Sequence, residues 1–404
     1  MKNLNDYAPF VGQSVIDDMK LAAEKLAGKK ITHVNSTPIG GGVAEILTRM
    51  VPLLNELGVQ SDWQVIKGNT SFFEVTKKMH NNIHGSGDPL SEDDKKVFVE
   101  NGKFNEDTMT CDSDIMFIHD PQPITLINKK KGNKWIWRCH IDASNPTGGT
   151  WEFLRDYIDK FDSAVFSSPL FSRQLPIRQF LISPSIDPLS DKNREMEPDE
   201  IKKYIEKYNI PLDKPLITQI SRFDRLKDPV GVIQSYKKVK PYVDCRLLLA
   251  GGTAVDDPEG RIVYQEVLEE AGKDKDIIVL EMPQDDLAVN AIQRSSTVVM
   301  QKSLKEGFGL TVSEALWKSK PVVASNVGGI PLQIKNKYSG MLCNSIDGAA
   351  FALKQLLNNP DFAKKMGENG REHVRNNFLL TRHIKEYMLL FLSLYVNEDV
   401  VVYK

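Results

Sequence analysis

The sequence contains little cysteine and no long apolar run. Its 404 residues include four cysteines, and no two of them form a Cys-x-x-Cys pair. Neither a disulfide framework nor a zinc knuckle is therefore indicated. The longest apolar run near either end, residues 388–396, falls well short of the roughly 20 residues that span a bilayer. The first residues lack the apolar core of a secretory signal, so we expect a cytoplasmic protein with no membrane partner.

Excess charge of either sign is also missing. The 52 Lys and Arg residues nearly balance the 54 Asp and Glu residues, which leaves a formal net charge of -2. No uniform basic field exists to bind a nucleic acid, so we expect no such partner. With 41% apolar and 26% charged residues, the chain is typical of globular proteins, and its length predicts two domains.

Short apolar segments alternate with helical stretches along the chain. This order predicts an α/β fold of two Rossmann-like, doubly wound domains, each with a parallel sheet. Prolines and a charged stretch after residue 183 interrupt the pattern and indicate a domain connection. We place the domains at 1–186 and 187–404, with a final helix at about 376–404 that can pack back on the first domain. The expected strands are residues 30–37, 115–119, 135–140, 164–167, 216–220, 246–250, 277–280, 297–300 and 321–324.

A glycine triplet, Gly40-Gly-Gly42, lies between an expected strand and an expected helix. Without side chains, Gly41 and Gly42 would let backbone N–H groups and the helix N-terminus approach a phosphate. The spacing is not that of a dinucleotide-binding fingerprint, which disfavours a dehydrogenase. A purely structural tight turn is the alternative interpretation.

A basic loop follows the first strand of the second domain and contains Arg222 and Lys227. A guanidinium fork and a compact ammonium together suit a leaving diphosphate. The alternative is a solvated cluster of charges.

Two glutamates bracket a glycine-rich turn that opens a helix, Glu306 before it and Glu314 about two turns later. Carboxylates accept hydrogen bonds from ribose and sugar hydroxyls, and helix N-terminal amides favour an anion. The segment therefore fits a sugar nucleotide, and the alternative is two ordinary helix glutamates. The turn between them consists of Gly307, Phe308, Gly309 and Leu310.

Polar residues also follow two strands of the first domain. Asp120, Arg138, His140 and Asp142 could converge on one wall and hold sugar hydroxyls. A structural role for His140 is the alternative. The pair His80 and His84 lacks a placed carboxylate, so we expect no metal site there.

Taken together, these segments resemble the retaining GT-B glycosyltransferases, and within them the trehalose glycosyltransferring synthases. The resemblance spans nearly the whole chain, and its most specific element is the pair Glu306 and Glu314 separated by seven residues. The closer matches are His33-Val-Asn-Ser-Thr37, Gly40-Gly-Gly-Val-Ala-Glu45, His119-Asp-Pro-Gln-Pro123, Trp137-Arg-Cys-His-Ile-Asp142, Pro184-Ser-Ile-Asp-Pro-Leu189 and Asp256-Asp-Pro-Glu-Gly260.

The resemblance implies two domains facing each other across a cleft and a reversible transfer of glucose from ADP-, UDP- or GDP-glucose to free glucose. The product would be α,α-trehalose, with no cofactor and no essential metal, and the enzyme would be a homodimer. On this model the diphosphate is bound by Gly41, Gly42, Arg222 and Lys227. Glu314 binds the ribose and Glu306 the donor hexose, with His140 near its 6-hydroxyl. Asp120 helps to seat the acceptor.

One departure from the family pattern concerns the basic loop, where Ser221 and Asp228 stand at positions that many relatives fill with glycine. A carboxylate at Asp228 would weaken phosphate binding if it pointed toward the phosphate. The competing functions are a retaining trehalose phosphorylase, a transferase with another sugar acceptor, a GT-B-fold epimerase and a non-catalytic nucleotide-sugar sensor.

Overall fold

The chain folds into two compact units in a computed structural model that describes residues 3–38, 42–252 and 258–395. Unit 1 comprises Met1–Ser185 and Leu380–Lys404, and unit 2 comprises Ile186–Leu379. The chain therefore crosses from one unit to the other twice, and the C-terminal helix belongs to the same unit as the N-terminus.

Unit 1 contains a six-stranded sheet with strand order β2-β1-β3-β4-β5-β6, and every neighbouring pair is parallel. Its strands are β1 (Lys30–Asn35), β2 (Gln60–Val65), β3 (Ile115–His119), β4 (Lys134–Cys139), β5 (Ser163–Phe166) and β6 (Arg178–Leu181). Its helices are η1 (Leu4–Tyr7), α1 (Ala8–Val11), α2 (Gln13–Glu24), α3 (Gly42–Glu56), α4 (Thr70–Ile83), α5 (Glu92–Thr108), η2 (Ile124–Lys129), α6 (Thr150–Ile158), η3 (Pro169–Phe171) and α15 (Leu380–Ser393).

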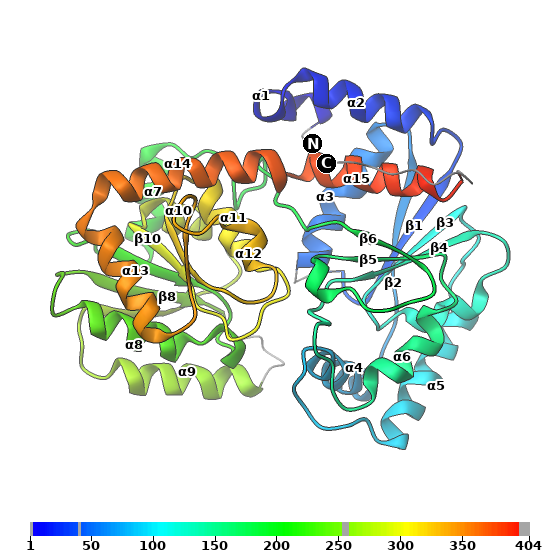
Figure 1. Ribbon diagram of the computed structural model, residues 1–404, viewed down its shortest axis with the longest axis horizontal. Helices are drawn as coiled ribbons and strands as arrows, with labels where there is room; N and C mark the ends of the chain where they lie inside the picture. The colour runs from blue at the N-terminus through cyan, green and yellow to red at the C-terminus, as the bar shows by residue number, and fades with distance from the viewer. Residues whose placement is uncertain (1–2, 39–41, 253–257, 396–404) are drawn as a thin grey trace. The chain divides into compact units, whose positions relative to one another are not determined.

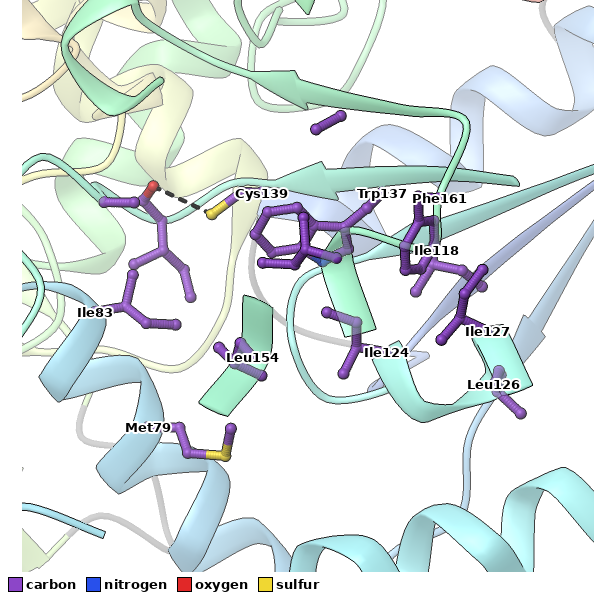
Figure 2. Close-up of a cluster of buried hydrophobic side chains, with 14 of the residues drawn as sticks. Met79, Ile83, Ile118, Ile124, Leu126, Ile127, Trp137, Cys139, Leu154 and Phe161 are labelled. Atoms are coloured by element: carbon purple, nitrogen blue, oxygen red, sulfur yellow. Dashed lines mark hydrogen bonds between the residues drawn. The ribbon is translucent and has the colours of Figure 1, made fainter. Parts of the chain in front are cut away.

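The two faces of this sheet differ in chemistry, because side chains alternate along each strand. One face carries Ile118, Trp137 and Cys139, and it packs on apolar residues of α4, α6 and η2 in the main core of unit 1 (Figure 2). The opposite face carries Phe117, whose ring lies 4.9 Å from that of Tyr387 on α15. The carboxyl end of that second face bears polar side chains, among them the candidate site residues of unit 1.

Unit 2 contains a second parallel sheet, with strand order β12-β11-β10-β7-β8-β9. Its strands are β7 (Leu216–Ile220), β8 (Arg246–Gly251), β9 (Ile277–Glu281), β10 (Val298–Gln301), β11 (Val322–Ser325) and β12 (Met341–Cys343). Its helices are α7 (Pro198–Lys207), η4 (Arg225–Lys227), α8 (Pro229–Val239), α9 (Pro258–Ala271), α10 (Asp286–Ser295), α11 (Leu310–Trp317), α12 (Ile330–Gln333), α13 (Ile346–Asn358) and α14 (Pro360–Asn377). Buried apolar clusters cover both of its faces.

The predicted α/β fold with two parallel sheets is confirmed, and every strand named from the sequence is present within a few residues. The final helix expected at about 376–404 corresponds to α15, which belongs to unit 1, whereas α14 belongs to unit 2. Helix α15 packs against α2 and α3 of unit 1 (Figure 1). Among the described residues, no helix is long and apolar enough to cross a membrane.

Candidate active site

The basic loop of unit 2 leaves β7 and places Lys227 in the short helix η4, at the carboxyl edge of the sheet. Gln219 holds this turn by donating from Nε2 to the Lys227 carbonyl at 2.8 Å. The Lys227 ammonium then lies 2.6 Å from Oε2 of Glu306. Arg222 extends outward instead, with 64% of its side chain exposed and Asp224 3.8 Å away. The structure thus brings Lys227, but not Arg222, to the first glutamate.

Glu306 is buried and held by its neighbours, with only 8% of its surface exposed. Ser303 Oγ donates to the same oxygen, Oε2, at 3.1 Å. The turn after β11 packs directly against the Glu306 backbone, since a Cβ at Gly328 would lie 1.7 Å from the Glu306 carbonyl oxygen. Only glycine fits at that position. The Asn326-Val-Gly-Gly turn therefore fixes where the Glu306 carboxylate stands.

Gly309 opens α11 in the left-handed region, with φ of 79°, and the exposed amides of the helix start follow it. Gly329 donates from its backbone to the Gly307 carbonyl at 3.1 Å. Phe308 is buried beneath this turn, whereas Gly307 and Leu310 keep part of their surface exposed. The turn therefore keeps accessible backbone beside Glu306.

Glu314 is also buried, at 5% exposure, and it lies on α11. Gln293 Nε2 lies 3.4 Å and Lys192 Nζ 3.9 Å from its two carboxylate oxygens. Lys318 donates to the Glu314 carbonyl at 3.1 Å, and burial lowers the pKa of Lys318 to about 7. Glu314 therefore stands among amino and amide groups.

A pocket of about 460 Å³ borders this cluster. Lys192 connects the two, since its ammonium also lies 3.8 Å from Asp286 Oδ1. The pocket is lined by Asp191, Pro283, Gln284, Asp285, Asp286 and Leu287. Its position next to Glu314 suits the remainder of a nucleoside whose ribose that glutamate would hold.

Asp228 has its own partners and is therefore not a free negative charge. It adopts a left-handed conformation with φ of 49° and caps α8, accepting from the Gly231 amide at 3.0 Å. Its other oxygen forms an ion pair with Lys302, a buried lysine after β10. This pairing removes the reason to expect that Asp228 repels a phosphate. Lys302 gave no signal in the sequence, because its partner lies 74 positions away.

In unit 1, Asp120 follows β3 in a left-handed conformation with φ of 64°. Its Oδ1 accepts from the His140 backbone amide at 2.8 Å, and its carbonyl accepts from Trp137 Nε1 at 3.1 Å. Burial raises the pKa of Asp120 to about 7, despite the opposing effects of that amide and of Arg138. The loops after β3 and β4 are thus joined, and Asp120 is poised to change charge near neutral pH.

Arg138 is fully buried and donates from Nη2 to Ser167 Oγ at 3.1 Å, while its Nε and Nη1 have no hydrogen-bond partner. Asp142 accepts from the Ser144 amide at 2.9 Å, within its own turn. The structure therefore places Arg138 beneath the Asp120 and His140 pair and Asp142 beside it.

His140 is the exposed end of a row of histidines that sequence reasoning missed. Its Nε2 lies 3.0 Å from Nδ1 of His119, whose Nε2 lies 3.1 Å from Nδ1 of His33. Burial lowers the pKa of His33 to about 3 and that of the other two well below the ordinary value. The sequence signal that could have indicated this row is the alternation of side chains along a strand, which puts His33 and His119 on one face of the sheet.

The remaining residues named from the sequence are those of the glycine turn, of the 256–260 segment and of the histidine pair. Gly41 and residues 256–257 lie outside the described residues, and Gly42 is the exposed first residue of α3. The rings of His80 and His84 lie 4.7 Å apart on and just after α4. Within the described part of the chain, no group of three or more His, Cys, Asp or Glu side chains could hold a metal ion.

Comparisons with known proteins identify the family of the chain. Residues 33–173 match the family described as trehalose synthase, N-terminal domain, and residues 200–373 match glycosyl transferases group 1. The chain is 43% identical to the trehalose synthase of Thermococcus litoralis and 39% identical to that of Rubrobacter xylanophilus, with 97% of both chains covered in each case. It is 30% identical to the trehalose phosphorylase of Pleurotus pulmonarius, covering 92% of this chain but 58% of that one.

Solved structures extend the likeness to the whole fold. Trehalose-6-phosphate synthase OtsA superimposes with a TM-score of 0.72 at 14% identity, covering 92% of this chain and 99% of that one. Sucrose-phosphate synthase from Thermosynechococcus elongatus gives 0.71 at 16% identity, covering 91% and 99%. At these identities the likeness concerns the fold alone, and it is the GT-B fold expected from the sequence.

Proposed function

The chain belongs to the trehalose synthase family of glycosyltransferases, and on this premise we propose that it forms α,α-trehalose from a nucleoside diphosphate glucose and free glucose. The transfer is reversible and retains the anomeric configuration. The observation that carries the proposal is the Lys227–Glu306 pair at 2.6 Å, beside the glycine turn that opens α11. A phosphate-binding cation and a sugar-binding carboxylate are thereby held next to each other.

Unit 2 binds the donor in this proposal. Lys227 supplies a point charge for the diphosphate, and the exposed Arg222 folds over it when the donor arrives. Glu306 accepts hydrogen bonds from the glucosyl hydroxyls, and Glu314 accepts them from the ribose. Because Lys227 lies 2.6 Å from Glu306, a diphosphate bound by Lys227 would lie beside the carboxylate that accepts from the glucosyl hydroxyls. The family resemblance also assigns Gly41 and Gly42 to the diphosphate.

Unit 1 holds the sugars with side chains that form hydrogen bonds. His140 bonds a hydroxyl of the donor glucosyl unit, and Asp120 helps to seat the acceptor together with Asp142. Arg138 acts from beneath this pair, because its side chain is fully buried. Hydrogen-bonding groups of this kind suit free glucose as acceptor, since glucose offers only hydroxyl groups.

Catalysis in this proposal relies on position and on stabilising the leaving diphosphate. The acceptor hydroxyl attacks the anomeric carbon on the face from which the phosphate departs, and that phosphate takes the hydroxyl proton. No side chain forms a covalent intermediate. No cofactor or essential metal has a part in the reaction, and the family resemblance further supports a cytoplasmic homodimer.

The experiment is proton and carbon NMR of the protein incubated with glucose and ADP-, UDP- or GDP-glucose, with EDTA present. The expected result is α,α-trehalose with one equivalent of free nucleoside diphosphate. A parallel incubation with glucose 1-phosphate and glucose, without nucleotide, tests the phosphorylase alternative, since trehalose forms there only if phosphate is the leaving group. A donor epimerised in the absence of acceptor, or another disaccharide, would contradict the proposal.

A further inference from the structure

Three histidines on neighbouring parallel strands form a continuous hydrogen-bonded row in unit 1. His33 lies on β1, His119 ends β3 and His140 follows β4 directly. The strand register pairs β1 with β3 and β3 with β4, so that all three side chains project from the same sheet face. The two nitrogen-to-nitrogen distances are 3.1 Å and 3.0 Å. Both are ordinary hydrogen-bond lengths.

Each contact in this row can hold only one proton, and this couples the three rings. Burial lowers the pKa of all three histidines, so each ring is neutral and carries one N–H. If His33 donates from Nδ1, His119 must accept at Nε2 and therefore donates from its own Nδ1 to His140. The row then has two arrangements only: all three rings protonated at Nδ1, or all three at Nε2.

The two ends of the row decide between these arrangements. Nε2 of His33 is buried and has no hydrogen-bond partner among the residues that the structure describes. Protonation of every Nε2 would leave an unpaired N–H there, whereas protonation of every Nδ1 leaves only an unpaired lone pair. Buried N–H groups without an acceptor are rarer in proteins than unsatisfied acceptors. The arrangement with all three rings protonated at Nδ1 is therefore favoured, and it makes His140 Nδ1 a donor.

The groups around the row keep it neutral. Arg138 lies beside His119 and His140 on β4, and helix α15 brings Arg382, His383 and Tyr387 to the same face. Arg382 is paired with Glu386 on its own helix. Asp120 accepts from the His140 backbone amide, and burial raises its pKa to about 7. A guanidinium close to the row disfavours a fourth proton on it.

We propose that His119 and His33 are positioning residues that fix the tautomer of His140, so that His140 Nδ1–H donates to a hydroxyl of the bound glucosyl unit. The part about the sugar rests on the proposed function, whereas the coupling of the three tautomers does not. His140 is the partly exposed member of the row, so it is the end that a ligand can reach. A sugar oxygen that accepts a hydrogen bond from His140 Nδ1 would therefore bind better than a group that can only donate one.

The test is the two-bond proton–nitrogen NMR spectrum of the full chain labelled with ¹⁵N-histidine, without ligand and at neutral pH. We expect His33, His119 and His140 all to show a protonated Nδ1. In His33→Leu the row loses its first donor, so we expect the His140 signal to move toward the Nε2-protonated form. The His33→Asn variant keeps a side-chain N–H donor, so we expect it to preserve the signature of the wild-type chain.

Kinetics supply a second readout. The His33→Leu substitution is expected to lower kcat about tenfold with little change in KM, as fits the loss of one oriented hydrogen bond, and His33→Asn should restore most of it. The matched control is His373→Asn in unit 2, where the ring donates from Nε2 to the Leu332 carbonyl at 3.1 Å. It should leave the His140 tautomer and kcat unchanged.

The inference is overturned if wild-type His140 is protonated at Nε2, or if its tautomer is the same in His33→Leu and in the wild-type chain. If His33→Leu does not fold, the wild-type and His33→Asn spectra still decide the outcome. The NMR spectra need no substrate. A failure of the glucosyl transfer assay would therefore refute the proposed function and leave the coupled tautomers standing.

Discussion

The polar clusters of the two units differ in how their charged side chains are paired. Around the glycine turn of unit 2, the partly buried Lys227 is paired with Glu306 and the buried Lys302 is paired with Asp228. In unit 1, Arg138 is fully buried and forms no ion pair among the described residues, and its histidine neighbours are kept neutral. A paired cluster can exchange one partner for a charged ligand, whereas a neutral one suits uncharged hydroxyls. The difference in charge thus agrees with a division between donor diphosphate and acceptor sugar.

The first prediction sharpens this comparison with acid, and it has the largest expected effect. Burial lowers the pKa of His33, His119, His140 and His383, so the unfolded state binds protons first as the pH falls below 6.5. Their stabilisation is complete above pH 6.5 and is lost on acidification. Asp120 opposes this, since its raised pKa adds stability between pH 7 and 3.8. The net loss is up to about 4 kcal/mol per pH unit below 6.5.

Tryptophan fluorescence measures this effect in unit 1 specifically. Four of the five tryptophans lie in unit 1, and Trp317 is the fifth. In Trp317→Phe, the fluorescence therefore reports unit 1 alone, while far-UV circular dichroism reports both units. We expect the fluorescence transition at a higher pH than the loss of the remaining helical signal. Coincident transitions near pH 4 would show that the buried histidines do not control acid unfolding.

The second prediction removes the central carboxylate of unit 2. The Glu306→Ala substitution deletes the acceptor for sugar hydroxyls and leaves Lys227 without its partner. Charge-assisted hydrogen bonds contribute about 1.5–3 kcal/mol each, so two of them imply a loss of about 1,000-fold in kcat/KM.

Steady-state kinetics with excess glucose measure this loss. Glu266→Ala is the matched control, because Glu266 is paired with Arg225 in the same unit but stands outside the site. It should change the rate less than twofold, since exposed ion pairs contribute little. Turnover by Glu306→Ala near the wild-type rate would remove Glu306 from the site.

The third prediction concerns stability rather than turnover. Asp228→Ala deletes the α8 cap and leaves Lys302 buried without a counter-charge, so the free energy of unfolding should fall by about 3 kcal/mol. The control is Ser345→Ala, which removes a cap from α13 but no ion pair, with an expected loss of about 1 kcal/mol. Thermal unfolding measures both. Equal losses would mean that the Lys302 pair contributes nothing.

The fourth prediction is the smallest and concerns the exposed cation. Arg222→Ala should raise the KM for the donor about tenfold and leave thermal stability unchanged, because the side chain has few contacts before the diphosphate binds. Arg222→Lys should recover part of the affinity, since a point charge replaces the fork. An unchanged KM in Arg222→Ala would show that Arg222 stays outside the site.

Periodicity predicted most of the fold, and its failures have physical causes. Buried central strands such as β7 and β8 are continuous apolar runs, which a pattern detects easily. Strand β2, with the sequence QSDWQV, is an edge strand with few β-branched residues and went undetected. The final helix was predicted from about residue 376, a few residues before α15 begins at Leu380.

The candidate site was predicted in its residue types but not in its pairings. The glycine turn and the two glutamates could be located because their spacing is local. The partners Lys227 and Glu306 lie 79 positions apart, and no spacing rule connects them. The row from His33 to His140 likewise depends on which strands are neighbours, since parity alone gives the face and not the contact.

The measurement that tests the division of labour most directly is hydrogen exchange of the whole chain, read by mass spectrometry, with a nucleoside diphosphate alone and with trehalose alone. The account predicts that the diphosphate slows exchange in residues 221–228 and 302–314 of unit 2. Trehalose should slow exchange chiefly in residues 119–142 of unit 1. Protection of the unit 1 segment by the diphosphate, with no change around Lys227 and Glu306, would contradict the account.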